Sequence, residues 1–362
     1  MKVSHTFTIL LFILFLYPAY GQWNNIGNAG FSANQVYNIS LCVYNGIPYV
    51  AYRDGGLSNK ATVMKFDNSK WITVGNAGFS AGQVYNISLS VYEGIPFVAY
   101  EDAAYSGKAT VVKFNGSSWV TIGKPGFSKG KADHTSLFVY KGIPYVAYTD
   151  GANNNRATAM MYNGSYWINI GNAGFTNGRA DLTSIYVYDN TPYIAFSDAG
   201  KNNKASVMKY SGSNWIDVGK AGFSTGLADF ISLNIYENNP YVAFKDFGNS
   251  GKATVMMFDG SRWTNVGKAG FSAGSADYIS MCVYNGNPYI AYKDDGNNGK
   301  VTVMMYDGSN WINVGKAGFS AGTAYYTSLY VYKGIPYVVY EDFVNNNKAT
   351  VLSFSGVIPK RN

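Results

Sequence analysis

The seven tryptophans of this chain are evenly spaced. Each follows the previous one by 48 residues, at positions 23, 71, 119, 167, 215, 263 and 311. Other residues keep the same step, among them a serine at 40, 88, 136, 184, 232, 280 and 328, and an aspartate at 54, 102, 150, 198, 246, 294 and 342. A fixed period of this length is typical of a solenoid, a propeller or an array. The chain is therefore expected to consist of one structural unit repeated seven times.

Each repeat contains four short runs with β-strand character, separated by turn signals. In the second repeat these runs are residues 87–92, 97–100, 108–114 and 119–123. Residues 93–96 are expected to turn the chain between the first two runs, and Asn115-Gly116 predicts a hairpin before the fourth. Helical periodicity is absent, and the runs are apolar on both faces. This pattern is expected for small sheets that each pack between two similar sheets.

Seven units of four antiparallel strands predict an all-β fold, a seven-bladed β-propeller. The repeat after Trp311 lacks its fourth run, because the next tryptophan is due at position 359 and that residue is Pro359. The missing run is present at the other end of the chain, at residues 23–27. We therefore expect the N-terminal strand to join the last blade and close the ring. An open β-solenoid is the alternative, but it would need atypical capping units at both ends.

The first 21 residues have the features of a secretory signal peptide. Lys2 and an apolar run over residues 7–17 precede small residues at positions 19 and 21, which predicts cleavage before Gln22. No later segment is apolar enough to be a membrane helix. The expected organisation is a signal peptide at 1–21 and one propeller domain at 22–362, in a secreted, extracellular protein.

Charge and cysteine content narrow the classes of function. The net charge of +7 is spread along the chain, which indicates solubility with a weak preference for acidic partners and no nucleic-acid patch. Cys42 and Cys282 occupy the same repeat position, since they are 240 residues apart. In a ring of seven they lie two blades apart, too far for a disulfide. Both are predicted to be free, buried thiols.

The most regular residues are interpreted as structural. The repeated tryptophan could be a platform for a sugar ring, but packing between blades is favoured because large rings dominate core burial. Each repeated aspartate is followed six residues later by a base, as with Asp102 and Lys108. These pairs could form ligand sites on one rim. The favoured interpretation is that the aspartate caps the turn and pairs with the base across the hairpin.

Binding residues are better sought where the repeats differ. The repeats diverge just before the repeated serine, in a segment expected to link neighbouring blades near the mouth of the channel. Aspartate and tyrosine there suit sugar recognition, because a carboxylate accepts from hydroxyls and a ring covers the apolar face of a pyranose. Ordinary loop variation is the alternative. The candidate ligand-binding residues are Tyr37, Tyr85, Asp133, His134, Asp181, Asp229, Asp277, Tyr278 and Tyr325.

Four Asn-x-Ser sequons predict glycosylation sites, if the host is eukaryotic. They are at Asn38, Asn86, Asn115 and Asn163. The first two would place glycans on the rim proposed for binding.

Constellations typical of an active site are weak in the sequence. After residue 21 the chain has one histidine, His134, and neither a Ser-His-Asp relay nor a metal-binding cluster is indicated. Paired carboxylates for glycoside hydrolysis remain possible, but an acid repeated in every blade is a poor candidate for one asymmetric active site. We therefore expect no enzyme, no catalytic residues, no metal and no cofactor.

The repeat Val-Tyr-x-Gly-x-Pro-Tyr-Val-Ala-Tyr-x-Asp resembles β-propeller repeats of secreted and surface proteins over essentially the whole mature chain. The Gly-Phe-Ser links, such as residues 266–272, also resemble the Gly-Gly-Trp links of tachylectin-type propeller lectins. That resemblance implies one sugar site per blade, although this chain has Phe where those lectins have Trp, and seven units in place of five. The hairpin at residues 259–263 is similar to the sialidase Asp-box, with a shorter spacing.

Taken together, the sequence favours a secreted, multivalent, lectin-like protein with repeated carbohydrate sites on one rim, strengthened by avidity. The expected partners are glycans or cell-surface glycoproteins, and the expected state is a monomer without membrane insertion or nucleic-acid binding. The alternative is an extracellular adhesion or matrix protein that binds proteins through the same rim. A glycan-active enzyme is the third hypothesis.

Overall fold

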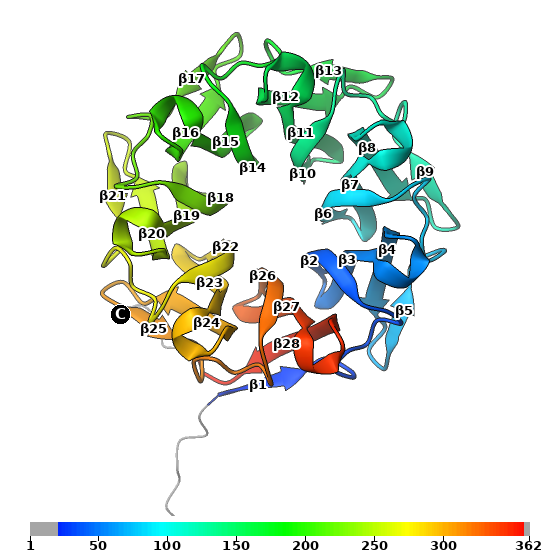
Figure 1. The fold of residues 1–362 in the computed structure, drawn as a ribbon, viewed down its shortest axis with the longest axis vertical. Helices are drawn as coiled ribbons and strands as arrows, with labels where there is room; N and C mark the ends of the chain where they lie inside the picture. Colours follow the sequence, from blue (N-terminus) through cyan, green and yellow to red (C-terminus); the bar gives the residue numbers. More distant parts are fainter. Residues whose placement is uncertain (1–20, 358–362) are drawn as a thin grey trace, which may run out of the picture.

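The computed structural model describes residues 21–357, which form a ring of seven four-stranded antiparallel sheets around a central channel (Figure 1). The predicted seven-bladed β-propeller is confirmed. The predicted signal peptide, apart from Gly21, lies outside the described residues.

Each blade has the same order of strands from the channel outwards. The innermost strands are β2 (Val36–Tyr44), β6 (Val84–Tyr92), β10 (Ala132–Tyr140), β14 (Ala180–Tyr188), β18 (Ala228–Tyr236), β22 (Ala276–Tyr284) and β26 (Ala324–Tyr332). The second strands are β3 (Ile47–Asp54), β7 (Ile95–Asp102), β11 (Ile143–Asp150), β15 (Thr191–Asp198), β19 (Asn239–Asp246), β23 (Asn287–Asp294) and β27 (Ile335–Asp342).

The outer half of each blade is shorter. The third strands are β4 (Lys60–Phe66), β8 (Lys108–Phe114), β12 (Arg156–Tyr162), β16 (Lys204–Tyr210), β20 (Lys252–Phe258), β24 (Lys300–Tyr306) and β28 (Lys348–Ser355). The outermost strands are β5 (Trp71–Thr73), β9 (Trp119–Thr121), β13 (Trp167–Asn169), β17 (Trp215–Asp217), β21 (Trp263–Asn265), β25 (Trp311–Asn313) and β1 (Gln22–Asn25).

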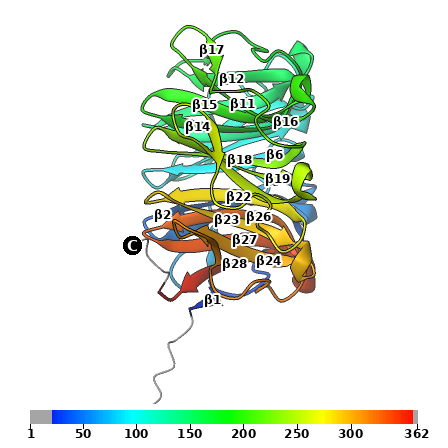
Figure 2. The same cartoon turned by 90° about the vertical axis from the view of Figure 1, so that its left-hand side faces the viewer.

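A single turn of 3-10 helix joins the second and third strands of every blade. These turns are η1 (Gly55–Leu57), η2 (Ala103–Tyr105), η3 (Gly151–Asn153), η4 (Ala199–Lys201), η5 (Phe247–Asn249), η6 (Asp295–Asn297) and η7 (Phe343–Asn345). They all lie on the face that is nearest the viewer in Figure 1, which is the right-hand face in Figure 2. The hairpin turns lie on the opposite face.

The first hairpin of each blade is tighter than the sequence predicted. Only Glu93 and Gly94 form the turn in the second blade, with φ of 50° and 77°. Positive φ at both residues matches the two-residue turns that suit the twist of paired strands. Ile95 and Pro96, predicted as part of the turn, already pair with Tyr92 and Val91. Pro96 is tolerated because it is close to the start of its strand.

The variable residues do not lie in the link between blades, as the sequence suggested. They are the first residues of the innermost strand. In β6, Tyr85 pairs with Glu101, the register shifts before Ser88, and Asn86 between them has a φ of 49°. This bulge inserts an extra residue and re-aims its side chain, so the third residue of each innermost strand turns towards the channel mouth.

The hydrophobic core is divided among the blade junctions. One cluster joins Tyr49, Ala51 and Val63 of the first blade to Leu89 and Val98 of the second. Six similar clusters occupy the other junctions. Each sheet is therefore apolar on both faces, as predicted.

The repeated tryptophan joins neighbouring blades, which confirms the structural interpretation. The indole Nε1 of Trp119 donates to the carbonyl of Val74 in the preceding blade at 2.8 Å. Its ring stacks on Phe79 of the Gly-Phe-Ser link, with ring centroids 4.2 Å apart. One side chain thus provides apolar burial and a satisfied polar group in a single contact.

The repeated serine makes a second, inner connection. Its hydroxyl accepts a hydrogen bond from a backbone N–H of the next innermost strand, as when Leu89 donates to Ser40 at 3.0 Å. The same bond recurs at every junction, including the one from Leu41 to Ser328 that spans the first and last blades.

The N-terminal strand closes the ring as predicted. Strand β1 pairs with β28, with Trp23 opposite Phe354. Trp23 donates to the carbonyl of Val314 at 2.8 Å and stacks on Phe319 at 4.3 Å. The closing junction therefore has the same contacts as the others.

The repeated aspartate caps its turn in every blade except the last, where Asp342 makes no such bond. The expected ion pair between the aspartate and the base is absent from residues 21–357. Buried Asp102 accepts from the N–H of Ala104 at 3.1 Å and from the hydroxyl of Thr110 at 3.0 Å. Lys108 is opposite Asp102 in the strand register only. The part of the prediction that concerned pairing is wrong, because the carboxylate is aimed at the threonine in the third strand.

We expect Trp23→Ala to destabilise the protein as much as Trp119→Ala. Both substitutions remove a stacked ring and leave a carbonyl of the preceding blade without its donor, at a cost of about 3 kcal/mol. Denaturant unfolding of the two variants beside the parent chain measures this. A cost for Trp23→Ala far below that of its internal counterpart would show that β1 does not contribute to closure.

Candidate ligand site at the channel mouth

The seven bulge residues meet around the channel on the face that carries the 3-10 turns. They line a cavity of about 260 Å³, together with the residue that follows each of them. Each has a φ between 47° and 56°. In chain order these mouth residues are Asn38, Asn86, His134, Leu182, Phe230, Tyr278 and Tyr326.

One side of the mouth is an arc of aromatic rings. The centroids of Phe230 and Tyr278 are 5.0 Å apart, and those of Tyr278 and Tyr326 are 4.9 Å apart. Tyr325 meets Tyr278 edge-on at 6.2 Å. Three adjacent blades, built on β18, β22 and β26, therefore present a continuous wall of rings, which we name the aromatic arc (Phe230, Tyr278, Tyr325 and Tyr326).

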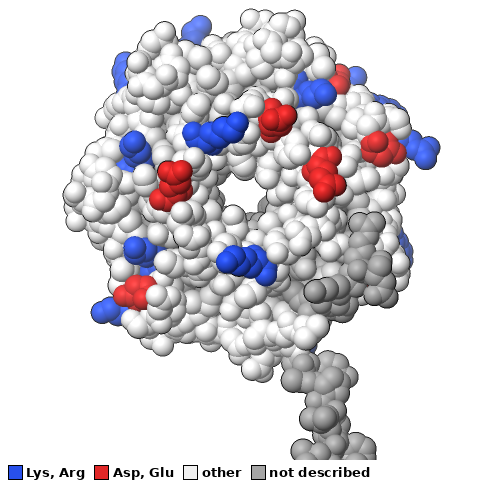
Figure 3. Space-filling view, turned by 180° about the vertical axis from the view of Figure 1, so that it is seen from behind, with Lys and Arg blue, Asp and Glu red and all other residues white. Residues whose placement is uncertain are grey.

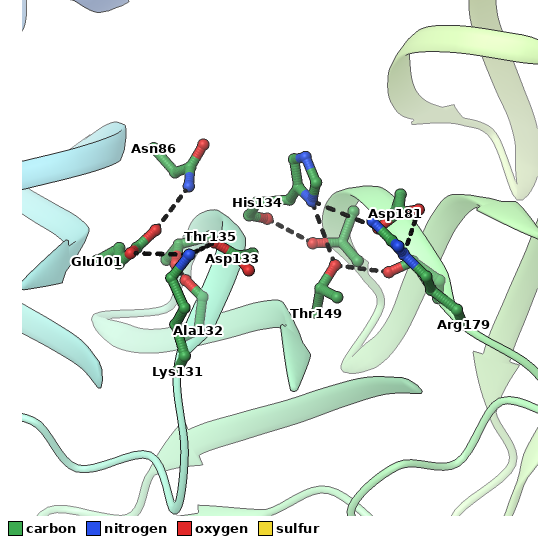
Figure 4. A network of polar contacts seen from close by, with 12 residues as sticks. Asn86, Glu101, Lys131, Ala132, Asp133, His134, Thr135, Thr149, Arg179 and Asp181 are labelled. Carbon is green, nitrogen blue, oxygen red and sulfur yellow. Dashed lines mark hydrogen bonds and ion pairs between the residues drawn. The ribbon is translucent and has the colours of Figure 1, made fainter. Parts of the chain in front are cut away.

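The opposite side of the mouth is polar, and Figure 4 shows its hydrogen-bond network. Asn86 donates to Oε2 of Glu101 at 3.1 Å. Lys131, from the link into the next blade, lies 3.5 Å from Oε1 of Glu101 and 2.7 Å from Asp133. We name Asn38, Asn86 and His134 the polar arc. Within this arc, Asn86 is held in place by Glu101, a carboxylate of the same blade.

His134 is positioned from two directions. Its Nδ1 is 3.3 Å from the hydroxyl of Thr149 and 3.9 Å from Asp181. Burial lowers the pKa of His134, although the charge of Asp181 opposes this shift. Arg179 holds Asp181 at 2.8 Å. The imidazole is therefore neutral at physiological pH, with one nitrogen available as donor or acceptor at the mouth.

Two lysines support the aromatic arc from behind. Lys245 and Lys293 both bind Asp277, at 2.5 and 3.1 Å. Burial acts to raise the pKa of Asp277, but the two lysines together lower it below its ordinary value. Lys245 also lies over the ring of Phe230 at 6.0 Å. Asp277 is therefore ionised and fully engaged.

Arg53 occupies the gap between the first two blades. Its guanidinium lies 5.1 Å from the ring centre of Tyr37 and 4.9 Å from that of Tyr85. It also donates to Asn59 at 3.0 Å. Arg53, like Glu101, immediately precedes a repeated aspartate.

That position before the aspartate carries two buried glutamates, Glu101 and Glu341. Burial, with repulsion from Asp133, raises the pKa of Glu101 to about 7 even though Lys131 opposes the shift. Burial alone raises the pKa of Glu341 to about 7. Oε2 of Glu341 is buried without a hydrogen-bond partner, as are Oδ1 of Asp342 and Oδ1 of Asn347 in the same loop.

The structure brings all nine predicted ligand-binding residues to this end of the channel. His134 and Tyr278 line the mouth itself. The other seven are one residue earlier in their strands, where each is opposite the residue before the repeated aspartate of its own blade. Asp229 differs from the other three aspartates, because it accepts the N–H of Phe230 at 2.8 Å.

Five residues at or beside the mouth are not among the candidates chosen from the sequence. Phe230, Tyr326 and Leu182 line the mouth, and Glu101 and Glu341 lie beside it. A signal was available, since the residue before each repeated aspartate changes from blade to blade while its neighbours stay constant. It runs Arg53, Glu101, Thr149, Ser197, Lys245, Lys293 and Glu341.

Both cysteines face the channel behind the mouth, in a cavity of about 490 Å³. Both are free thiols, as predicted. Cys42 is buried and Cys282 is half-buried. Burial raises the pKa of Cys42 to about 12 and that of Cys282 to about 11, so neither is a thiolate at neutral pH.

Acidic and basic side chains are mixed on the opposite face of the ring. Its first hairpin turns carry Glu93, Lys141, Asp189, Glu237 and Lys333, and Figure 3 shows acidic and basic side chains interspersed around the central opening. Two predicted sequons, Asn115 and Asn163, lie in exposed hairpins between the third and fourth strands of their blades. The side chain of each accepts hydrogen bonds from two backbone N–H groups. The other two, Asn38 and Asn86, line the mouth.

Comparisons with known proteins return carbohydrate-related propellers at low sequence identity. A Trypanosoma rangeli sialidase in complex with sialic acid gives a TM-score of 0.50 at 12% identity over 94% of this chain, which spans only 59% of that protein. The polysaccharide lyase Uly1 gives 0.55 at 10% identity, covering 91% of both chains. An arginine-to-alanine triple mutant of AofleA from Arthrobotrys oligospora gives 0.53 at 10% identity, covering 82% of this chain and 91% of that one.

At such identities the likeness concerns the fold alone. No protein-family model matches the sequence, and no curated protein matches it. The suggested resemblance to tachylectin-type lectins is not supported by these comparisons.

The expectation that the protein is not an enzyme is contradicted by these neighbours, because a sialidase and a polysaccharide lyase share its fold. The aspartate repeated in every blade is also not the only acid near the channel, since Glu101 and Glu341 are not repeated and both have a pKa of about 7. Within residues 21–357 no group of three or more His, Cys, Asp or Glu side chains is arranged to hold a metal ion.

Stability is expected to fall as the pH rises from about 4.5 to about 7. The pKa of Glu341 is raised by folding, from 4.5 to about 7, so in this window the folded chain keeps a proton that the unfolded chain has lost. Across this pH range the titration of Glu341 lowers the free energy of unfolding by about 3 kcal/mol. Glu341→Gln should match the parent at pH 4.5 and exceed it in stability at pH 8.

Denaturant unfolding of both proteins between pH 4.5 and 8 tests this. If the free energy of unfolding changes with pH in the same way for parent and variant, Glu341 is not a buried carboxyl without a partner. Glu93→Gln, an exposed glutamate on the opposite face, is the control and should leave the pH dependence unchanged.

Proposed function

We propose that this protein binds carbohydrate in the mouth of its channel. The observation that carries the proposal is the division of one 260 Å³ cavity into an aromatic arc and a polar arc. Sugar rings have apolar faces that pack on aromatic side chains, and hydroxyls that need amide, imidazole or carboxylate partners. Both kinds of group meet here within reach of one bound sugar ring.

The proposal favours one asymmetric site over seven equivalent sites on the rim. The mouth residues comprise two asparagines, two tyrosines, a histidine, a leucine and a phenylalanine, so rotation by one blade does not reproduce the site. The aspartates suggested as separate sugar ligands are largely engaged already, Asp133 by Lys131 and Asp181 by Arg179. Their role is then to hold the mouth residues in place.

The comparisons support a carbohydrate ligand without indicating which one. A sialidase and a polysaccharide lyase have this fold and act on carbohydrates. Identities of 10 and 12% carry no specificity across to this chain. A catalytic step on the bound glycan is a second candidate function, favoured by Glu341, whose carboxyl has a pKa of about 7 beside the aromatic arc.

We further propose that the protein acts outside the cell, on the basis of the signal-like residues 1–21. No helix within residues 21–357 has the length and apolar character needed to cross a bilayer. Glycans attached to Asn38 or Asn86 would fill the mouth. Use of these two sequons and binding of a ligand in the mouth therefore exclude one another.

Tyr278→Ala and Tyr326→Ala are each expected to weaken glycan binding by about 10- to 100-fold, because each removes a stacking surface. A glycan array that includes sialylated, uronate-containing and amino sugars identifies a ligand, and calorimetry measures its affinity and stoichiometry. Tyr166→Ala is the control, since this tyrosine is 63% exposed in a hairpin on the opposite face.

The expected stoichiometry is one glycan per chain. Several equivalent glycans per chain, or equal affinity in all three tyrosine variants, would contradict binding in the mouth. Mass analysis of the bound glycan after incubation with the parent protein tests the catalytic candidate, which predicts shorter products.

A further inference from the structure

Glu341 is a carboxyl group without a partner beside the aromatic arc. It is 5% exposed, and Oε2 is buried with no hydrogen-bond partner. Among the described residues no ion pair is made by Glu341. In the strand register it is opposite Tyr325 of the aromatic arc, and its charge adds to the burial that raises the pKa of the Tyr326 hydroxyl.

The second blade contains the same glutamate with its partners in place. Glu101 occupies the position of Glu341 and receives an N–H from Asn86 at 3.1 Å and the ammonium of Lys131 at 3.5 Å. The repeat maps Asn86 onto Tyr326 and Lys131 onto Gln35, since 326 − 86 = 240 and 131 − 35 = 96, both multiples of 48. Glu341 therefore occupies the position at which Glu101 pairs with a lysine, but the equivalent of that lysine is Gln35.

No other group on the described chain supplies the missing positive charge. Arg53 acts on the Tyr326 hydroxyl, but it is held by Asn59 and lies over the rings of Tyr37 and Tyr85. The Asn347 amide, in the loop that follows Glu341, carries no charge. A buried carboxylate without a countercharge is costly, and a cation that reaches it removes this cost.

The other acids around the mouth do not share this need. Asp133, Asp181 and Asp277 each have a lysine or arginine within 3.1 Å. Asp229 is half-buried and accepts a backbone N–H. Of the acids around the mouth, Glu341 is therefore the one whose pairing with a positively charged ligand group would add most to the binding free energy.

We propose that the mouth selects amino sugars, and that the ammonium group of the ligand binds Glu341 as the ammonium of Lys131 binds Glu101. The inference rests on the proposed binding of carbohydrate in the mouth. The rings of Tyr278 and Tyr326 strengthen the site, because aromatic faces attract cations. The 260 Å³ cavity, which Tyr278 and Tyr326 line, provides the space for one sugar ring.

The test compares three tetrasaccharides at pH 6.5 by calorimetry: a β-1,4-linked glucosamine tetramer, its N-acetylated form and the corresponding glucose tetramer. The parent protein should bind the amine about 10- to 100-fold more tightly than the two neutral sugars, the range expected for a hydrogen bond to a charged group. Glu341→Gln should abolish this preference, by lowering the affinity for the amine to that for the neutral tetramers.

A second variant removes the preference without removing the carboxylate. Gln35→Lys places in the last junction the lysine that Lys131 provides beside Glu101. This lysine should occupy Glu341, so the amine preference should disappear and stability at pH 8 should rise. Glu93→Gln, on the opposite face, is the control and should keep the preference.

The outcomes separate the two proposals. Equal binding of the three sugars, or an amine preference that survives in Glu341→Gln and in Gln35→Lys, overturns the amino-sugar inference while carbohydrate binding stands. An equal loss of affinity for all three sugars in Glu341→Gln also overturns it, since the glutamate would then accept from a hydroxyl. Failure of the parent to bind any sugar on the array or among the tetramers overturns both proposals.

Discussion

The contact on which this molecule depends is the donation of a tryptophan N–H to a carbonyl of the preceding blade, beneath a stacked phenylalanine. A four-stranded blade has no core of its own, and its apolar faces are buried only against its neighbours. The tryptophan fixes that packing at the outer edge, and the repeated serine fixes it near the channel. Trp23 of the last blade makes the same bond to the sixth blade, and Ser328 of the last blade accepts the same bond from the first blade, so both junctions of the last blade match the others.

This distribution of contacts leaves the bulge residues free to vary. The side chain at that position faces the mouth and makes neither the tryptophan bond nor the serine bond that joins the blades. Phe230 and His134 can therefore occupy equivalent positions without disturbing the blades that carry them. A regular architecture can in this way support an irregular site, in which an aromatic arc and a polar arc face each other across one channel.

The repeats also provide an internal comparison for the electrostatics of the mouth. Glu101 and Glu341 have the same backbone setting and the same burial, yet only Glu101 has an amide and an ammonium beside it. Burial raises the pKa of both carboxyls to about 7, and only Glu101 is also subject to repulsion by Asp133 and attraction by Lys131. A partnered carboxylate holds a neighbour in place, whereas an unpartnered one is available to a ligand.

The sequence by itself determined the blade count, the strand order, the closing strand, the structural role of the tryptophan and the free state of both cysteines. These follow from a strict 48-residue period, because each blade repeats the same local pattern and packs against copies of itself. The tertiary structure alone decided the site. The structure extended the innermost strands through a bulge, paired Asp102 with Thr110 in place of Lys108, and buried Glu341 without a hydrogen-bond partner at Oε2. Periodicity cannot show such features, because they depend on how one blade differs from the neighbour that it meets only after the ring has closed.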